Sequence, residues 1–149
     1  MGARIYIVED NSDTRTMLAT LIETCCEGVE VCGTAASAEQ ALDELDAAKV
    51  DLVLVDISLP TMSGIDFVRS ALARWPQLRC LMLSAHPESM YARRVLALGA
   101  RGYVAKGDVD QLLEAIPRVL DGGTYLPPRV GGAPGPRDAG PAGRPRRDG

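Results

Sequence analysis

Five short apolar segments alternate with five helix-like segments along this chain, and that alternation limits the possible folds more than any other feature. Apolar, largely β-branched runs of this length are typical of strands buried on both faces of a parallel sheet. Strands that alternate with helices are joined by right-handed crossovers. We therefore expect an α/β fold with one parallel sheet covered by helices on both faces. The expected strands span residues 4–8, 29–33, 52–55, 79–83 and 102–105.

The segments between the expected strands carry helical periodicity and helix-capping residues. For example, Ser37 followed by Gln40 forms a capping box, and Asp108 with Gln111 opens the last helix in a similar way. Pro117 falls inside that last helix, where the missing N–H and the ring clash cost about 3 kcal/mol or more. The expected helices begin near residue 12, at Ser37, near residue 64, at Pro87 and at Asp108.

The net charge changes sign near residue 128. Residues 1–128 carry 11 Lys and Arg against 18 Asp and Glu, a net of −7, whereas residues 129–149 carry five Arg and two Asp, a net of +3. This last segment holds six Gly and four Pro and has almost nothing apolar to bury. We therefore expect one domain over residues 1–128, followed by a disordered Gly/Pro/Arg-rich tail over residues 129–149.

No apolar run approaches the length of a membrane span, and the N-terminus has no secretory pattern. A cytoplasmic protein without a membrane partner is expected. The four cysteines show no zinc-ligand spacing, so they are expected to be buried free thiols.

Polar residues follow four of the five expected strands. Glu9 and Asp10 follow the first, Asp56 the third, Ser84 the fourth and Lys106 the fifth. The carboxyl ends of parallel strands meet at one edge of a sheet, where ligands bind. Crowded carboxylates repel one another unless a cation joins them, and hard oxygen ligands suit Mg²⁺. Lys106 and Ser84 could then hold the oxygens of a phosphoryl group on Asp56, which would act as a nucleophile.

Each of these residues also has an ordinary structural explanation when it is taken alone. Asp10 or Asp56 could cap a helix, Lys106 could be a solvated surface residue, and Tyr103 could be a strand aromatic. The functional interpretation depends on their occurring together at the strand ends.

Over residues 3–127 the chain resembles a response-regulator receiver domain of two-component systems. The residues that carry the resemblance are VEDN at 8–11, LVDISLPTMSGID at 54–66, MLSAH at 82–86 and GARGYVAKG at 99–107. The segments LALGARGYVAK and GGTYLPP are similar to those of the NarL/FixJ type. The resemblance implies a flavodoxin-like (βα)5 doubly wound fold, with a five-stranded parallel sheet in the strand order 2-1-3-4-5.

The resemblance also implies a phosphorylation site with Mg²⁺ as its cofactor. Asp56 resembles the phosphoacceptor, and Glu9 and Asp10 resemble the acidic pair that holds the metal together with Asp56. Ser58 would supply a backbone carbonyl to the same ion. Such a domain is not a conventional enzyme, because it catalyses only its own phosphorylation and dephosphorylation.

Three further positions match the conformational switch of the family. Lys106 resembles the phosphate-binding lysine, Ser84 the hydroxyl that turns toward the phosphoryl group, and Tyr103 the aromatic that moves inward behind it. The resemblance implies phosphoryl transfer from a sensor histidine kinase to Asp56, and a changed surface on the fourth helix, fifth strand and fifth helix. Signalling would then proceed by protein contacts, including a phosphorylation-dependent homodimer.

Two other classes of protein with this architecture fit the sequence less well. A flavodoxin-like electron carrier needs a neutral loop for the FMN phosphate after the first strand, and the segment EDNSD would repel it. An aspartyl phosphatase needs a second acid two positions after its nucleophile, where this chain has Ser58.

Members of the NarL/FixJ type usually continue into a helix-turn-helix domain, whereas this chain continues into its Gly/Pro/Arg-rich tail. Two outputs therefore stay open: a stand-alone receiver, including a phosphate sink, or a DNA-binding regulator that has lost its output domain. We expect no sequence-specific DNA binding by these 149 residues.

Overall fold

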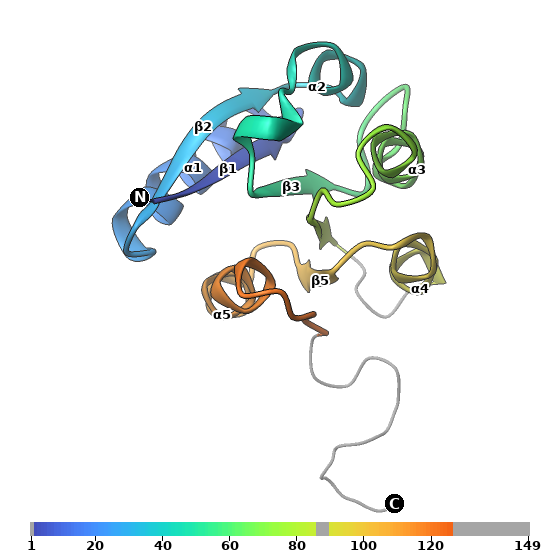
Figure 1. The fold of residues 1–149 in the computed structure, drawn as a ribbon. Helices are drawn as coiled ribbons and strands as arrows, with labels where there is room; N and C mark the ends of the chain where they lie inside the picture. Colours follow the sequence, from blue (N-terminus) through green and yellow to red (C-terminus); the bar gives the residue numbers. More distant parts are fainter. Residues whose placement is uncertain (1, 86–89, 127–149) are drawn as a thin grey trace, which may run out of the picture.

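A computed structural model describes residues 2–85 and 90–126, which form one parallel sheet with helices on both sides (Figure 1). The strand order is β2-β1-β3-β4-β5, and every neighbouring pair is parallel. This confirms the flavodoxin-like (βα)5 fold and the strand order 2-1-3-4-5. The strands are β1 (Ala3–Val8), β2 (Val29–Ala35), β3 (Leu52–Asp56), β4 (Cys80–Ser84) and β5 (Gly102–Ala105).

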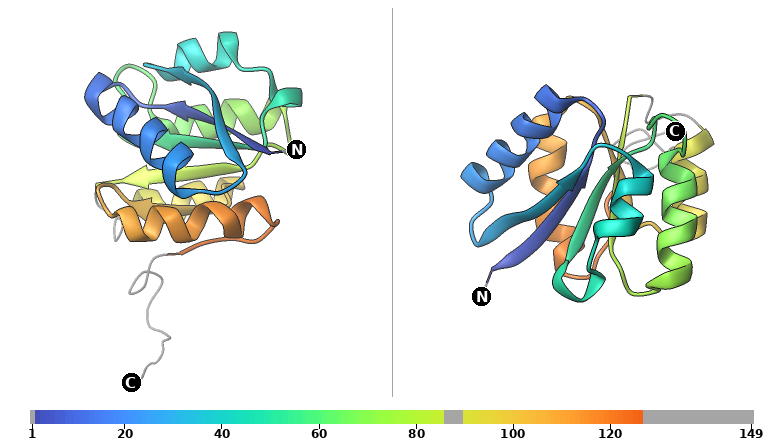
Figure 2. Two further views of the ribbon diagram at one scale, coloured as in Figure 1. Left: turned by 90° about the vertical axis from the view of Figure 1, so that its left-hand side faces the viewer. Right: turned by 90° about the horizontal axis from the view of Figure 1, so that it is seen from above.

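Two helices cover one face of the sheet, and three cover the other (Figure 2). The side chains of α1 and α5 enclose one hydrophobic cluster with the sheet, and those of α2, α3 and α4 enclose the second. All five residues of β3 and all five of β4 are buried, which explains why these strands read as continuous apolar runs. The helices are α1 (Ser12–Cys25), α2 (Ala38–Glu44), α3 (Gly64–Arg74), α4 (Met90–Leu98) and α5 (Val109–Leu120).

The second strand and the α2–β3 connection differ from the sequence-based expectation. β2 extends to Ala35, two residues further than expected, and it contains a register shift, because Ile5 pairs with Val31 and Tyr6 with Gly33. Between these two pairs β2 has one residue more than β1, so the pairing is irregular at this point. A short 3-10 helix, η1 (Ala47–Lys49), precedes β3 and was not expected.

Pro117 lies inside α5, as expected, and the helix continues past it to Leu120. The ring is on the exposed side of the helix, and the Pro117 carbonyl accepts a hydrogen bond from the N–H of Asp121 at 3.0 Å. The proline therefore removes one donor without ending the helix.

Several expectations concern residues outside the described ranges. These are the start of the fourth helix at Pro87, the end of the domain at residue 128 and the tail over residues 129–149. Among the described residues, no helix is both long enough and apolar enough to cross a lipid bilayer.

Residues 124–126, which we call the exit segment, run beside β5 as the chain leaves the sheet. Tyr125 pairs with Gly102 in a parallel bridge. The N–H of Tyr103 donates to the carbonyl of Tyr125 at 3.2 Å, and the N–H of Tyr125 donates to the carbonyl of Arg101 at 3.0 Å. The Tyr125 hydroxyl donates to Oε1 of Glu114 in α5 at 3.2 Å. The exit segment is thus tied to both β5 and α5.

The close approach of the exit segment explains why a glycine occupies position 102. A Cβ atom on Gly102 would clash with the Tyr125 carbonyl oxygen. We expect Gly102→Ala to lower the free energy of unfolding by about 1–3 kcal/mol, because backbone rather than a flexible side chain must move. Urea denaturation measures this. Gly123→Ala is the control, because its Cβ would lie 3.2 Å from its nearest neighbour; equal losses in the two variants would contradict the prediction.

Tyr125 should make stability sensitive to alkaline pH. Burial, and then the charge and hydrogen bond of Glu114, raise the pKa of Tyr125 to about 12 from 10.0. The folded state therefore favours the neutral phenol, so this stabilisation is present below pH 10 and is lost as the pH rises through about 12. Between those pH values, Tyr125→Phe should lose less free energy of unfolding than the unaltered protein in urea titrations. Equal losses of free energy of unfolding in the two proteins would contradict the assignment of this pH dependence to Tyr125.

Candidate functional site: an acidic pocket with one lysine

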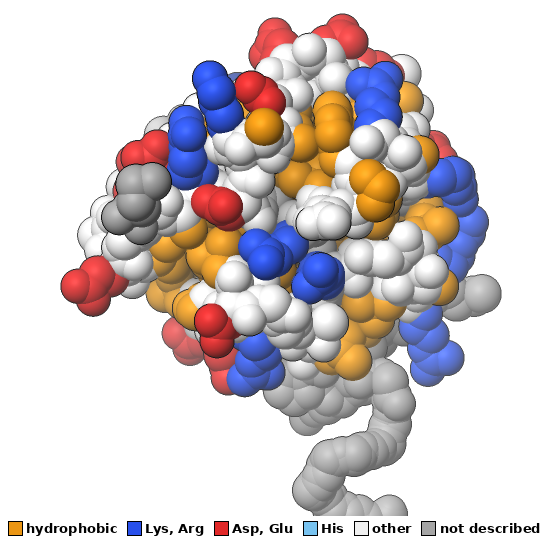
Figure 3. Space-filling view, viewed as in Figure 1, with side chains coloured by type: hydrophobic (Ala, Val, Ile, Leu, Met, Phe, Trp, Pro, Cys, Tyr) orange, Lys and Arg blue, Asp and Glu red, His pale blue; other side chains and the backbone are white. Residues whose placement is uncertain are grey.

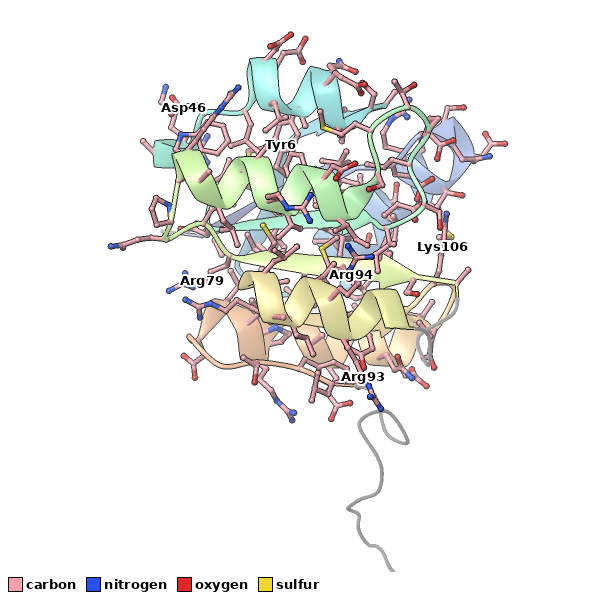
Figure 4. All side chains as sticks on the ribbon, turned by 90° about the vertical axis from the view of Figure 1, so that its right-hand side faces the viewer. Tyr6, Asp46, Arg79, Arg93, Arg94 and Lys106 are labelled. Atoms are coloured by element: carbon pink, nitrogen blue, oxygen red, sulfur yellow. The ribbon has the colours of Figure 1, made fainter. Side chains whose placement is uncertain are left out.

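The two central strands bring two carboxylates to the same edge of the sheet. Glu9 directly follows β1, Asp56 ends β3, and Val8 pairs with Val55. In Figure 4, Lys106 lies at the edge toward which the strand arrows point, and Arg79 lies at the opposite edge. The expected convergence of polar residues at the carboxyl edge is therefore found.

Asp56 is only 2% exposed, and both of its carboxylate oxygens accept hydrogen bonds. Oδ1 accepts from the backbone N–H of Ser58 at 2.9 Å, and Oδ2 accepts from Nζ of Lys106 at 2.7 Å. These bonds hold the carboxylate inside the pocket. Asp56 is not a helix cap, because α3 begins eight residues later and is capped by Ser63.

Glu9 is fully buried, and its two oxygens differ in their partners. Oε2 accepts from the N–H of Asn11 at 3.1 Å, whereas Oε1 lies 3.3 Å from Nζ of Lys106 and accepts no hydrogen bond from the described residues. Burial raises the pKa of Glu9, although the N–H of Asn11 and the Lys106 charge partly oppose it.

Lys106 is the cation that lies nearest to both buried carboxylates. Its side chain is 31% exposed. Burial alone would lower the pKa of Lys106, but the hydrogen bond and charge of Asp56, together with Glu9, outweigh it and raise the pKa. The ammonium group is therefore held in its charged form beside the two acids.

The loops around the site give structural roles to two residues whose roles were not predicted. Asn11, rather than Asp10, caps α1 by accepting from the N–H of Thr14 at 2.9 Å. Gly64 begins α3 against the end of β3, and a Cβ atom there would lie 2.5 Å from the Asp56 carbonyl oxygen. The asparagine one residue before the first helix, and the glycine after Ser63, were signals available in the sequence.

Ser84 and Tyr103 lie on neighbouring strands, on one face of the sheet. Met82 pairs with Tyr103 and Ser84 with Ala105, so the alternation of side chains puts Ser84 and Tyr103 on that common face. Ser84 is 4% exposed, and Tyr103 is already buried at 1%. Burial raises the pKa of Tyr103, and the charge of Arg93 in α4 partly opposes this.

Three carboxylates form a cluster that suits a small, hard cation. One oxygen each from Glu9, Asp10 and Asp56 lie within 4.8 Å of one another. The Oε1 atom of Glu9 is buried, and its ion pair with Lys106 Nζ at 3.3 Å leaves it able to accept a further ligand. Oxygen donors with an exposed Asp10 at the entrance fit Mg²⁺, which keeps several of its waters.

The chain belongs to the response regulator receiver domain family, whose family model matches residues 5–117. It is therefore a receiver domain of the kind found in two-component systems. A solved structure of a LuxR-family two-component response regulator from Aurantimonas sp. SI85-9A1 is 32% identical to it, with a TM-score of 0.80. That match covers 86% of this chain and 91% of the other.

The curated relatives are longer proteins. The chain is 32% identical over 128 residues to the transcriptional regulatory protein DegU of Brevibacillus brevis, covering 85% of this chain and 54% of DegU. It is 29% identical over 128 residues to the response regulator GacA of Pseudomonas viridiflava, covering 85% of this chain and 59% of GacA. This chain thus spans somewhat more than half the length of these relatives.

The acidic cluster should cost stability when no cation neutralises it. Asp10 is exposed, so Asp10→Asn removes one of three neighbouring charges at little cost in packing. We expect a gain of about 1 kcal/mol in the free energy of unfolding in EDTA, and a smaller stabilisation by added Mg²⁺. Thermal unfolding with and without Mg²⁺ measures both effects.

Asp13→Asn is the matched control for this change. Asp13 is in the first turn of α1, where a negative charge favours the helix N-terminus, so its removal should lower stability slightly. A loss of stability in Asp10→Asn would show that the cluster does not act by repulsion.

Proposed function

We propose that the domain over residues 1–128 is a phosphorylation-controlled switch whose phosphoacceptor is Asp56. The observation that carries the proposal is the position of Lys106, which donates to Asp56 Oδ2 at 2.7 Å and lies 3.3 Å from Glu9 Oε1. A nearly buried carboxylate held by one lysine, beside a buried acid that is able to accept a further ligand, is suited to acyl phosphate chemistry. Membership of the receiver family supports the same function.

In the proposed reaction, a carboxylate oxygen of Asp56 attacks the phosphorus atom of a phosphohistidine on a sensor histidine kinase. The new O–P bond forms as the P–N bond breaks, and the electron pair returns to the imidazole nitrogen. Lys106 then shifts from the carboxylate to a phosphoryl oxygen, and the hydroxyl of Ser84 donates to another. Fixed donors of this kind stabilise the charge on the transferring oxygens.

Mg²⁺ is the proposed cofactor. Glu9, Asp10 and Asp56 would hold it through carboxylate oxygens, and Ser58 through its backbone carbonyl. When bound, the ion neutralises charge on the transferring phosphoryl group. The N–H of Ser58 already donates to Asp56 at 2.9 Å, which supports the assignment of this loop to the site.

The proposed readout is the surface formed by α4, β5 and α5. Tyr103 lies behind Ser84 on the same face of the sheet, and Arg93 of α4 lies close enough to influence the Tyr103 hydroxyl. Because Tyr103 is already 1% exposed, an adjustment within the buried site, rather than a swing from solvent, would accompany phosphorylation. A change in α4 would then alter binding to a second copy or a protein partner.

The output of the switch has two candidates. The relatives DegU and GacA are named as regulators, and DegU as a transcriptional one, so a DNA-binding output elsewhere in a longer protein is one candidate. The other is signalling by protein contacts alone, or a phosphate sink, in the cytoplasm. We favour protein contacts for this chain, because the net charge of −7 over residues 1–128 repels DNA.

Asp56→Asn should abolish covalent phosphorylation. With Mg²⁺ and a small phosphodonor such as acetyl phosphate, the unaltered protein should gain one phosphoryl group that is stable in acid and labile in base. Intact-protein mass spectrometry measures the gain. The exposed Asp66→Asn is the control and should be labelled normally; undiminished labelling of Asp56→Asn would refute the assignment of the phosphoacceptor.

A further inference from the structure

Two surfaces on opposite sides of the domain, one over α1 and α5 and the other over α3 and α4, carry opposite charge. Residues 10–27 and 106–121, which comprise α1, α5 and their flanking residues, hold eight acids and three bases, a net of −5. Helices α3 and α4 hold four arginines and one acid, a net of +3. In Figure 3, Lys and Arg side chains outline the margin beside α3 and α4, whereas Asp and Glu dominate the margin beside α1 and α5.

The acidic face also exposes apolar side chains. Met17 of α1 is 49% exposed and Val109 of α5 is 40% exposed, and they are two of the three large hydrophobic residues that the described ranges leave exposed. Both line a groove of about 220 Å³ between α1 and the β5–α5 connection, whose floor includes Leu18, Leu21 and Leu112. We call this surface the acidic face.

The opposite side of the domain has a hollow with basic residues at its rim. Its volume is about 440 Å³, and Ile57, Leu59 and Ile65 contribute apolar lining. Arg69 of α3 and Arg94 of α4 also line it, and Figure 4 places Arg94 between the two helices. Arg69 pairs with Asp66 at 3.1 Å, but both side chains are more than half exposed, so that pair is weak. We call this surface the basic face.

We propose that two copies of this chain associate head to tail, with the acidic face of one against the basic face of the next. Met17 and Val109 would enter the hollow lined by Ile57, Leu59 and Ile65, while the surrounding acids would meet Arg69 and Arg94. Both the charge and the apolar character of the two surfaces are complementary. A symmetric contact between two acidic faces is disfavoured, because it would bring a net of −5 against a net of −5.

A head-to-tail contact between two copies does not form a closed, symmetric dimer. Each associated pair leaves one acidic and one basic face free, so the assembly grows with concentration instead of stopping at a dimer. The contact should also weaken as salt screens the opposed charges, because the Debye length falls from about 10 Å at 0.1 M to about 3 Å at 1 M.

Two charge variants of the full chain test this arrangement. Variant A, Arg69→Glu with Arg94→Glu, changes the net charge of α3 and α4 from +3 to −1. Variant B, Met17→Arg with Val109→Arg, places two cations at the apolar contact point of the acidic face, whose net charge changes only from −5 to −3. All four positions are exposed, and circular dichroism checks that the variants fold. Sedimentation equilibrium at low salt should show concentration-dependent growth of the unaltered protein and at least about tenfold weaker association of each variant alone.

An equimolar mixture of the variants gives the decisive result. Variant A keeps its acidic face and variant B keeps its basic face, so the mixture should form a one-to-one pair that does not grow further. A monomeric unaltered protein at millimolar concentration and low salt would overturn the proposal. So would continued association of variant A alone, which indicates contact between acidic faces, or a mixture that does not pair.

Discussion

The ammonium group of Lys106 lies between two carboxylates, those of Glu9 and Asp56, that the sheet buries at its carboxyl edge. Burying two like charges is costly unless a cation accompanies them, and the cation here comes from a strand at the far end of the sheet order. The arrangement therefore exists only when β1, β3 and β5 are aligned in one sheet. The fold and the site depend on the same register.

Much of this arrangement could be predicted from the sequence. The strand ends were recognisable because β3 and β4 are buried on both faces and read as unbroken apolar runs. The partners of each carboxylate were not predictable. Whether Lys106 bonds to one acid or lies between two depends on tertiary geometry, and the assignment of Asn11 as the helix cap depends on a local backbone angle. The pairing of the exit segment with β5 was not predictable either. The segment pairs at a single residue, so its sequence has no alternation of apolar and polar residues that would indicate a strand.

The two hydrogen-bond donors of Asp56 connect the site to opposite sides of the molecule. Lys106 lines the groove between α1 and the β5–α5 connection, and Ser58 lines the hollow beside α3 and α4. A chemical change at this one carboxylate would disturb both donors at once. Packed interiors transmit small displacements, so both surfaces lie within reach of a change at the pocket. Contacts on either side of the domain can therefore be coupled to the state of Asp56.

Hydrogen bonds fix the position of the exit segment against the sheet. The carbonyl of Tyr125 is hydrogen-bonded to the N–H of Tyr103, and the next residue, Leu126, is 45% exposed. A domain grafted directly after Leu126 would start one residue from this main-chain bond. Because Tyr125 is hydrogen-bonded to Tyr103, a rotation of the backbone at Tyr103 would change the direction of the exit segment. A conformational change in this domain would thus change the orientation of a module grafted after Leu126, with no contact between the two.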